Sequence, residues 1–108
     1  MPPLTRKRTR RPPHREMQSH AAEAAALLRS LGNEQRLLIL CHLVEAERGV
    51  GELLSRLDLS QSALSQHLAV LREAELVQTR REGLQVFYAI APGPVQPLLA
   101  TLHSIYCA

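Results

Sequence analysis

Two cysteines are the side chains of this chain best suited to covalent chemistry, and they stand far apart in the sequence. Cys41 lies in the segment LLILCHLVEAE, and Cys107 lies in LHSIYCA, 107 − 41 = 66 positions later. In a reducing compartment such cysteines are expected to be thiols with chemical or packing roles rather than a permanent bridge. The alternative is that Cys41 is an ordinary buried residue and Cys107 an incidental terminal thiol.

A run of short polar side chains offers a second kind of chemistry, which is hydrogen bonding to the edges of bases. Ser60 is a good N-cap for the segment QSALSQHLAVLREAEL, in which Leu64, Leu68 and Leu71 recur at helical spacing and predict the buried face. The other face carries Gln61, Ser62, Ser65, Gln66 and His67. Glutamine can hydrogen-bond adenine at two points, and serine is adaptable. The pattern therefore favours a helix that reads DNA, and the alternative is an ordinary solvated face.

Helical patterns precede this segment. Residues 16–31 are rich in alanine and leucine and predict a first helix that ends at Gly32. A second helix follows over residues 33–47, with one face formed by Leu37, Leu40, Cys41 and Val44. Cys41 is therefore expected to point toward the protein interior or an interface. Gly49 ends this helix, and residues 50–57 predict a short third helix before a tight turn at residues 58 and 59.

Strand and turn signals follow the polar helix. Residues 76–81 and 84–90 favour β structure around a Glu82-Gly83 turn, so they predict a hairpin. Arg80 and Arg81 are expected to meet phosphate or the minor groove near its tip. Residues 95–108 predict a final amphipathic helix. About five helices and a hairpin wing, in this order, are typical of the mostly α winged helix-turn-helix fold.

Positive charge is concentrated at the start of the chain. Residues 1–16 carry a net charge of 6 − 1 = +5, and residues 17–108 carry 7 − 9 = −2, from totals of 13 Lys+Arg and 10 Asp+Glu. Four prolines and few apolar residues predict a disordered basic arm over residues 1–15. The arm is either a solvated tail or a source of phosphate contacts. Residues 16–108 are expected to form one DNA-binding and dimerisation domain.

Composition and motifs bear on other classes of protein. The sequence contains no run of about 18 apolar residues and no apolar signal-peptide core, so we expect a cytoplasmic protein that does not enter a membrane. It also lacks paired catalytic carboxylates, a nucleophile motif and a phosphate loop, which argues against an enzyme and against a cofactor. A winged module that contacts proteins instead of DNA remains an alternative.

The segment VGELLSRLDLSQSALSQHLAVLREAELVQTRREGLQVFYAI, with the preceding LGNEQRLLILCHLVE, resembles the signature region of the ArsR family of bacterial repressors. The resemblance covers most of residues 22–106. It implies a repressor that binds double-stranded operator DNA as a homodimer, with the first and last helices packed across a two-fold axis. The sequence agrees, because apolar residues are left over for such an interface at Leu27, Leu28, Leu98, Leu99, Leu102 and Ile105.

The inducer is a separate question. Many ArsR regulators bind metal, but their Cys-x-Cys and Asp/His/Glu ligand patterns are absent here, so no metal site is expected. A mixed site of Cys41, His42, His103 and Cys107 remains an alternative. The segments around the two cysteines resemble the sulfide- and persulfide-responsive branch of the family. This implies that Cys41 and Cys107 react with persulfide or polysulfide, or with an oxidant, to form an intraprotomer disulfide or polysulfide bridge that releases DNA. His103, one turn before Cys107, and His42 are candidates to favour a thiolate.

Overall fold

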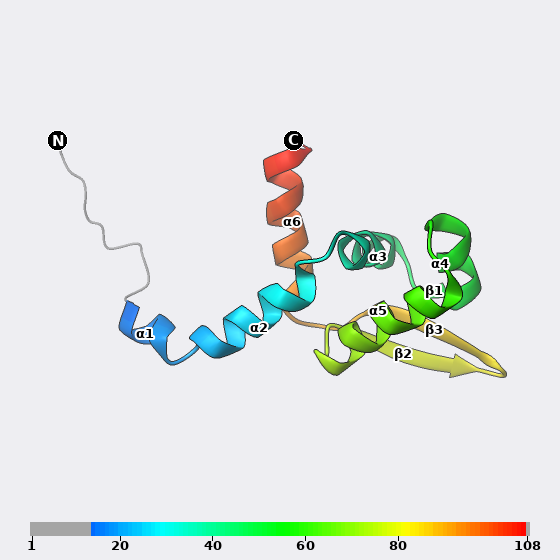
Figure 1. Ribbon diagram of the computed structural model, residues 1–108, viewed down its shortest axis with the longest axis horizontal. Helices are drawn as coiled ribbons and strands as arrows, with labels where there is room; N and C mark the ends of the chain where they lie inside the picture. The colour runs from blue at the N-terminus through cyan, green and yellow to red at the C-terminus, as the bar shows by residue number, and fades with distance from the viewer. Residues whose placement is uncertain (1–13, 108) are drawn as a thin grey trace.

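Residues 14–107 are described by the structure, a computed structural model, and they form six helices and three short strands. In chain order these are α1 (His14–Gln18), α2 (Ala21–Leu31), α3 (Glu34–Glu45), β1 (Arg48–Gly49), α4 (Val50–Arg56), α5 (Gln61–Glu73), β2 (Val77–Glu82), β3 (Gln85–Ile90) and α6 (Val95–Tyr106) (Figure 1). The mostly α fold with a hairpin wing confirms the predicted class. The helices number six instead of about five.

The extra helix arises because the predicted first helix is interrupted. The Ser19 hydroxyl donates to the Glu16 carbonyl at 2.9 Å, and the His20 N–H donates to the Met17 carbonyl at 2.9 Å. These bonds close a turn that separates α1 from α2, since a serine side chain competes with the helical backbone for its carbonyls. The prediction of a single helix over residues 16–31 was therefore wrong. α1 begins at His14, two residues before the predicted start of the domain, and residues 1–13 of the predicted arm lie outside the described residues.

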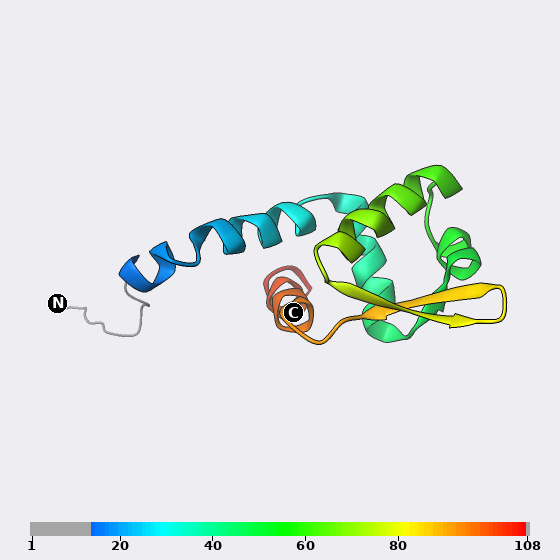
Figure 2. The same cartoon turned by 90° about the horizontal axis from the view of Figure 1, so that it is seen from below.

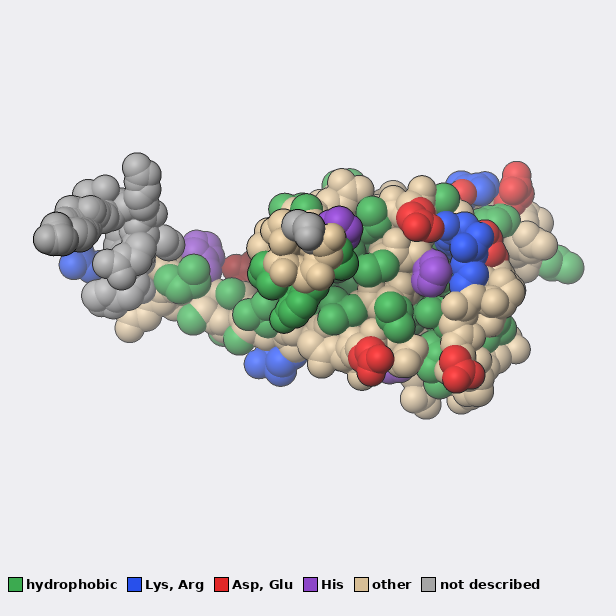
Figure 3. Space-filling model, turned by 90° about the horizontal axis from the view of Figure 1, so that it is seen from above, with side chains coloured by type: hydrophobic (Ala, Val, Ile, Leu, Met, Phe, Trp, Pro, Cys, Tyr) green, Lys and Arg blue, Asp and Glu red, His purple; other side chains and the backbone are tan. Residues whose placement is uncertain are grey.

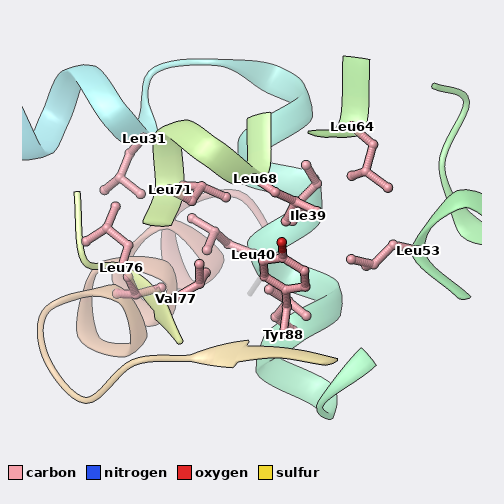
Figure 4. Packing of buried hydrophobic residues seen from close by; sticks show 12 residues of the cluster. Leu31, Ile39, Leu40, Leu53, Leu64, Leu68, Leu71, Leu76, Val77 and Tyr88 are labelled. Atoms are coloured by element: carbon pink, nitrogen blue, oxygen red, sulfur yellow. The ribbon is translucent and has the colours of Figure 1, made fainter. Parts of the chain in front are cut away.

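The core lies where α3 and α5 pack over the sheet (Figure 4). Leu64 and Leu71 are 0% exposed and Leu68 is 2% exposed, which confirms the predicted inner face of α5. The inner face of α3 was predicted in part. Leu40 is buried and Leu37 packs partly against the core as expected, but Ile39 and Leu43 are buried where Cys41 and Val44 were predicted. Cys41 is exposed and does not point into the interior.

The wing is a hairpin in a three-stranded antiparallel sheet with the order β1-β3-β2. Glu82 pairs with Gln85, so the turn is Gly83-Leu84, one residue later than predicted. Gly83 has a φ of 63°, a left-handed conformation that glycine adopts without strain. Strand β1 was not predicted, since two residues show no periodicity. It forms where α3 has ended, and Arg48 pairs there with Tyr88.

Helices α1 and α2 extend away from the body of the domain, at the end opposite the wing (Figures 1 and 2). Several large apolar side chains on α1, α2 and α6 remain exposed: Met17, Leu28, Ile105 and Tyr106. Figure 3 shows hydrophobic side chains gathered around α6 and continuing onto α2. Of the predicted surplus residues, Leu28 and Ile105 are exposed, whereas Leu27, Leu98 and Leu99 pack partly against the core. None of the helices in residues 14–107 has the length and apolar character needed to cross a membrane.

Candidate DNA interface and thiol pair

Helix α5 begins at a capped end and presents a polar strip. The Ser60 hydroxyl accepts from the Ala63 N–H at 3.1 Å, which satisfies one backbone donor of the first turn. Because the leucine face is buried, four of the predicted residues share the solvent side: Gln61, Ser62, Ser65 and Gln66. Gln61 and Ser65 also line a groove with α4 and the wing tip, where Leu84 and Gln85 lie. The geometry suits a helix that enters a DNA groove.

His67 lies apart from this strip. Its side chain is half-buried, and its Nδ1 is 3.4 Å from Nη1 of Arg36 at the start of α3. Arg36 also donates to the carbonyl of Ser30 at 2.7 Å and to that of Arg29 at 3.1 Å. The predicted DNA-contacting histidine is therefore part of a link between the end of α2, the start of α3 and α5.

The two wing arginines differ in their surroundings. Arg80 donates through Nε to Glu47 Oε2 at 3.0 Å and through Nη2 to Glu47 Oε1 at 2.7 Å. Its guanidinium carbon lies 4.8 Å from the centroid of the Phe87 ring. The fork lowers the pKa of Glu47 and raises that of Arg80, since each hydrogen bond favours the charged form. Arg81 is exposed and takes part in none of the ion pairs found within residues 14–107.

Sequence reasoning missed Arg36 and Glu47. Arg36 contacts His67, which lies 31 positions later in the chain, and Glu47 accepts a hydrogen bond from Arg80, which lies 33 positions later. Neither residue stands in a motif of its own. Only the folded backbone brings these partners together.

Cys41 opens onto a groove of about 480 Å³ between α3 and α6. The groove is lined by Cys41, Val44, Glu45, Gln96, Leu99, Ala100 and His103. Partial burial raises the pKa of the Cys41 thiol, and the negative charges of the Cys107 thiolate and the Glu45 carboxylate raise it further. Cys107 follows α6 and is exposed, with its backbone N–H bonded to the His103 carbonyl at 2.8 Å. Both cysteines are free thiols, and Cys107 lies one turn beyond His103, which lines the same groove as Cys41.

The mixed metal site is not assembled within the described residues. Within residues 14–107, no three side chains of His, Cys, Asp or Glu are gathered closely enough to hold an ion together. His103 lines the groove beside Cys41, whereas His42 does not.

Cys41 is expected to react with iodoacetamide at a higher pH midpoint in the folded chain than in the urea-unfolded chain. The thiolate is the nucleophile, and burial and Glu45 raise the pKa of this thiol only when the chain is folded. A Cys107→Ser chain isolates Cys41, since the sequence has 2 cysteines. Glu45→Gln should move the folded midpoint toward the unfolded one, and Glu34→Gln, at the other end of α3, should not. Equal midpoints in folded and unfolded chains would contradict the raised pKa.

An exposed polar helix within a helix-turn-helix, beside a hairpin wing, defines a winged-helix DNA-binding protein. Residues 33–79 match the family described as "Bacterial regulatory protein, arsR family". The chain belongs to this family, which confirms the resemblance seen in the sequence, and it is a transcription regulator and not an enzyme.

Individual relatives cover most of the chain. It is 52% identical over 92 residues to the transcriptional activator HlyU of Vibrio cholerae, spanning 85% of both proteins. It is 46% identical over 92 residues to the biofilm growth-associated repressor of Agrobacterium fabrum, spanning 85% of this chain and 79% of that protein. Reduced HlyU from Vibrio cholerae superposes with a TM-score of 0.80 at 51% identity, covering 87% of this chain and 99% of the other. The repressor BigR from Xylella fastidiosa superposes with a TM-score of 0.82 at 41% identity, covering 89% and 98%.

Proposed function

We propose that this chain is a repressor that occupies operator DNA through α5 and leaves it when Cys41 and Cys107 become bridged. The observation that carries the proposal is the placement of two free thiols on facing helices: Cys41 on α3 shares a groove with His103 of α6, and Cys107 lies one turn beyond His103. Three relatives at 41–46% identity are named biofilm growth-associated repressors, which supports repression over the activation named for HlyU.

The DNA-reading surface combines α5 with the wing. The polar strip meets base edges, and Arg81 meets phosphate beside it. The basic residues of the arm, over residues 1–15, add phosphate contacts, and the last two of these residues belong to α1. The domain that follows, over residues 16–108, binds DNA and dimerises.

A homodimer would cover the apolar side chains that remain exposed. Leu28 on α2 is 60% exposed, and Ile105 and Tyr106 on α6 are 63% and 79% exposed. Packing these helices against the same helices of a second copy is an isologous contact, and it presents two α5 helices to two half-sites. A change in α6 would then alter the spacing between the two reading helices.

The sulfur chemistry proceeds by two displacements. A cysteine thiolate attacks the sulfane sulfur of a persulfide R–S–SH, which forms Cys–S–SH and releases the thiolate RS⁻. The second cysteine thiolate attacks the inner sulfur of Cys–S–SH, which forms the disulfide and releases HS⁻. The two thiols are oxidised by two electrons, and the sulfane sulfur is reduced to sulfide. With a polysulfide donor, extra sulfur atoms can stay in the bridge.

We place the first attack at Cys107, which is exposed after the end of α6, and the resolving step at Cys41, which lies in the groove where partial burial raises its pKa and disfavours its thiolate. The bridge joins α3 to α6 and closes a long loop. Such a constraint is worth about 4 kcal/mol in the chain-entropy picture, enough to shift a dimer between two shapes. The release of DNA follows from the displacement of α6 at the dimer interface.

The test measures binding of the reduced, metal-free protein to the DNA upstream of its own coding sequence, by fluorescence anisotropy. Polysulfide should release the wild-type protein and should leave Cys41→Ser and Cys107→Ser bound. Intact mass then distinguishes a disulfide from a bridge with extra sulfur, and dithiothreitol should restore binding. Zinc and peroxide run in parallel.

Three results would overturn the sulfur mechanism. These are release of Cys41→Ser by polysulfide, retention of the wild-type protein, and release by zinc alone. If peroxide released the DNA as effectively as polysulfide, the inducer would be a general oxidant and not a persulfide.

A further inference from the structure

The carboxylate of Glu47 accepts two hydrogen bonds from the guanidinium of Arg80. Glu47 lies in the connection between α3 and β1, in the body of the domain, whereas Arg80 lies on β2 in the wing. The two contacts measure 3.0 Å and 2.7 Å, and Arg80 also lies over Phe87 on β3. Glu82 adds a weaker contact at 3.5 Å. The side-on edge of the guanidinium, formed by Nε and Nη2, is thus already engaged by a carboxylate.

The strand register separates the two wing arginines. Arg80 lies opposite Phe87 and Arg81 lies opposite Val86, so their side chains leave opposite faces of the hairpin. Arg81 has no carboxylate partner among the ion pairs of the described residues. The wing therefore offers one engaged and one available guanidinium.

We propose that Glu47 sets how many cations the wing offers to DNA: it holds Arg80 against the body of the domain and leaves Arg81 as the phosphate ligand. The Glu47–Arg80 ion pair is called the strap below. For Arg80 to bind a phosphate through its side-on edge, it would have to give up the two hydrogen bonds to Glu47 and its place over Phe87. It would also leave the Glu47 carboxylate unpaired beside a polyanion. The strap consequently persists in the DNA complex. The proposal rests on the DNA interface proposed above, since it assigns different roles to Arg80 and Arg81 in the wing of that interface.

The salt dependence of binding to a duplex counts phosphate contacts, because each contact changes the slope of log K against log salt by about 0.9. A duplex of unrelated sequence serves as the probe. Arg81→Gln should make the slope shallower by about 0.9, and Arg80→Gln should leave it unchanged. Glu47→Ala should make it steeper by about 0.9, because the freed Arg80 finds a phosphate. In Glu47→Ala/Arg80→Gln the slope should return to the wild-type value.

The double variant and Glu73→Ala control for charge alone, since Glu73 is exposed and takes part in none of the ion pairs found within residues 14–107. A steeper slope that survives in Glu47→Ala/Arg80→Gln, or that appears equally in Glu73→Ala, would assign the effect to the lost negative charge and overturn the strap. A shallower slope in Arg80→Gln would show that Arg80 already binds phosphate and would overturn it as well. Urea unfolding of each variant checks that the fold is intact. Failure of the wild-type protein to bind any duplex would instead contradict the proposed function, so the two failures are distinguishable.

Discussion

A Ser65→Glu chain is expected to bind its upstream DNA at least about 100-fold more weakly than the wild-type chain, which corresponds to about 2.7 kcal/mol. Ser65 is exposed on α5 and lines the groove between this helix and the wing. A carboxylate there faces phosphates and the acceptor atoms of bases, and such like-charge contacts cost several kcal/mol. Because glutamate is a good helix former, the helix itself should persist. Fluorescence anisotropy with a labelled operator measures the loss.

The matched control is Ser19→Glu. Ser19 is also exposed, but it lies between α1 and α2, at the end of the molecule away from the wing (Figure 1). The Ser19→Glu substitution adds the same charge to the chain as Ser65→Glu. Because it lies away from α5 and the wing, it should change the affinity far less. If both variants lost affinity equally, the effect would be one of net charge, and α5 would not be the reading helix.

Replacing Leu40 by alanine is expected to lower the free energy of unfolding by about 2–5 kcal/mol. Leu40 on α3 is 0% exposed and packs among core residues from α5 and the sheet (Figure 4). The loss combines the transfer of apolar surface with the cavity left behind. Since small domains have only about 5–15 kcal/mol in total, the midpoint of thermal unfolding should fall by about 8 °C or more.

Leu84→Ala makes the same chemical change at the wing tip, where the side chain is 99% exposed. Its free energy of unfolding should remain within about 0.5 kcal/mol of the wild-type value. Urea titration followed by circular dichroism measures both variants under the same conditions. A loss in Leu40→Ala no larger than that in Leu84→Ala would contradict the assignment of α3 to the core.

The local sequence pattern was sufficient to predict the buried residues of an element wherever one of its faces is clearly apolar. On α5, leucines at positions 64, 68 and 71 are separated by polar residues, and all three are buried as predicted. On α3 the same reasoning was right for Leu40 and wrong for Cys41, because every residue from Leu37 to Cys41 is apolar. Periodicity cannot choose among such neighbours. The packing of α5 and β3 against α3 selects Ile39, Leu40 and Leu43.

The short elements show the same limit. The β1 strand has only two residues, and its existence depends on pairing with β3, about 40 positions later in the chain. The break between α1 and α2 depends on one serine hydroxyl that bonds a carbonyl three residues earlier. Alanine-rich composition predicted helix there and could not locate the interruption.

The sequence by itself determined the family, the order of helices and strands, and the polar strip of α5, since each of these is recorded in motifs or in spacing along the chain. Only the tertiary structure decided the partners of the functional side chains. It paired Arg80 with Glu47, turned His67 toward Arg36, and placed Cys41 in a groove against α6. The reason is physical: these contacts join residues that lie 31 or more positions apart, and the packing of the helices and sheet brings them within reach.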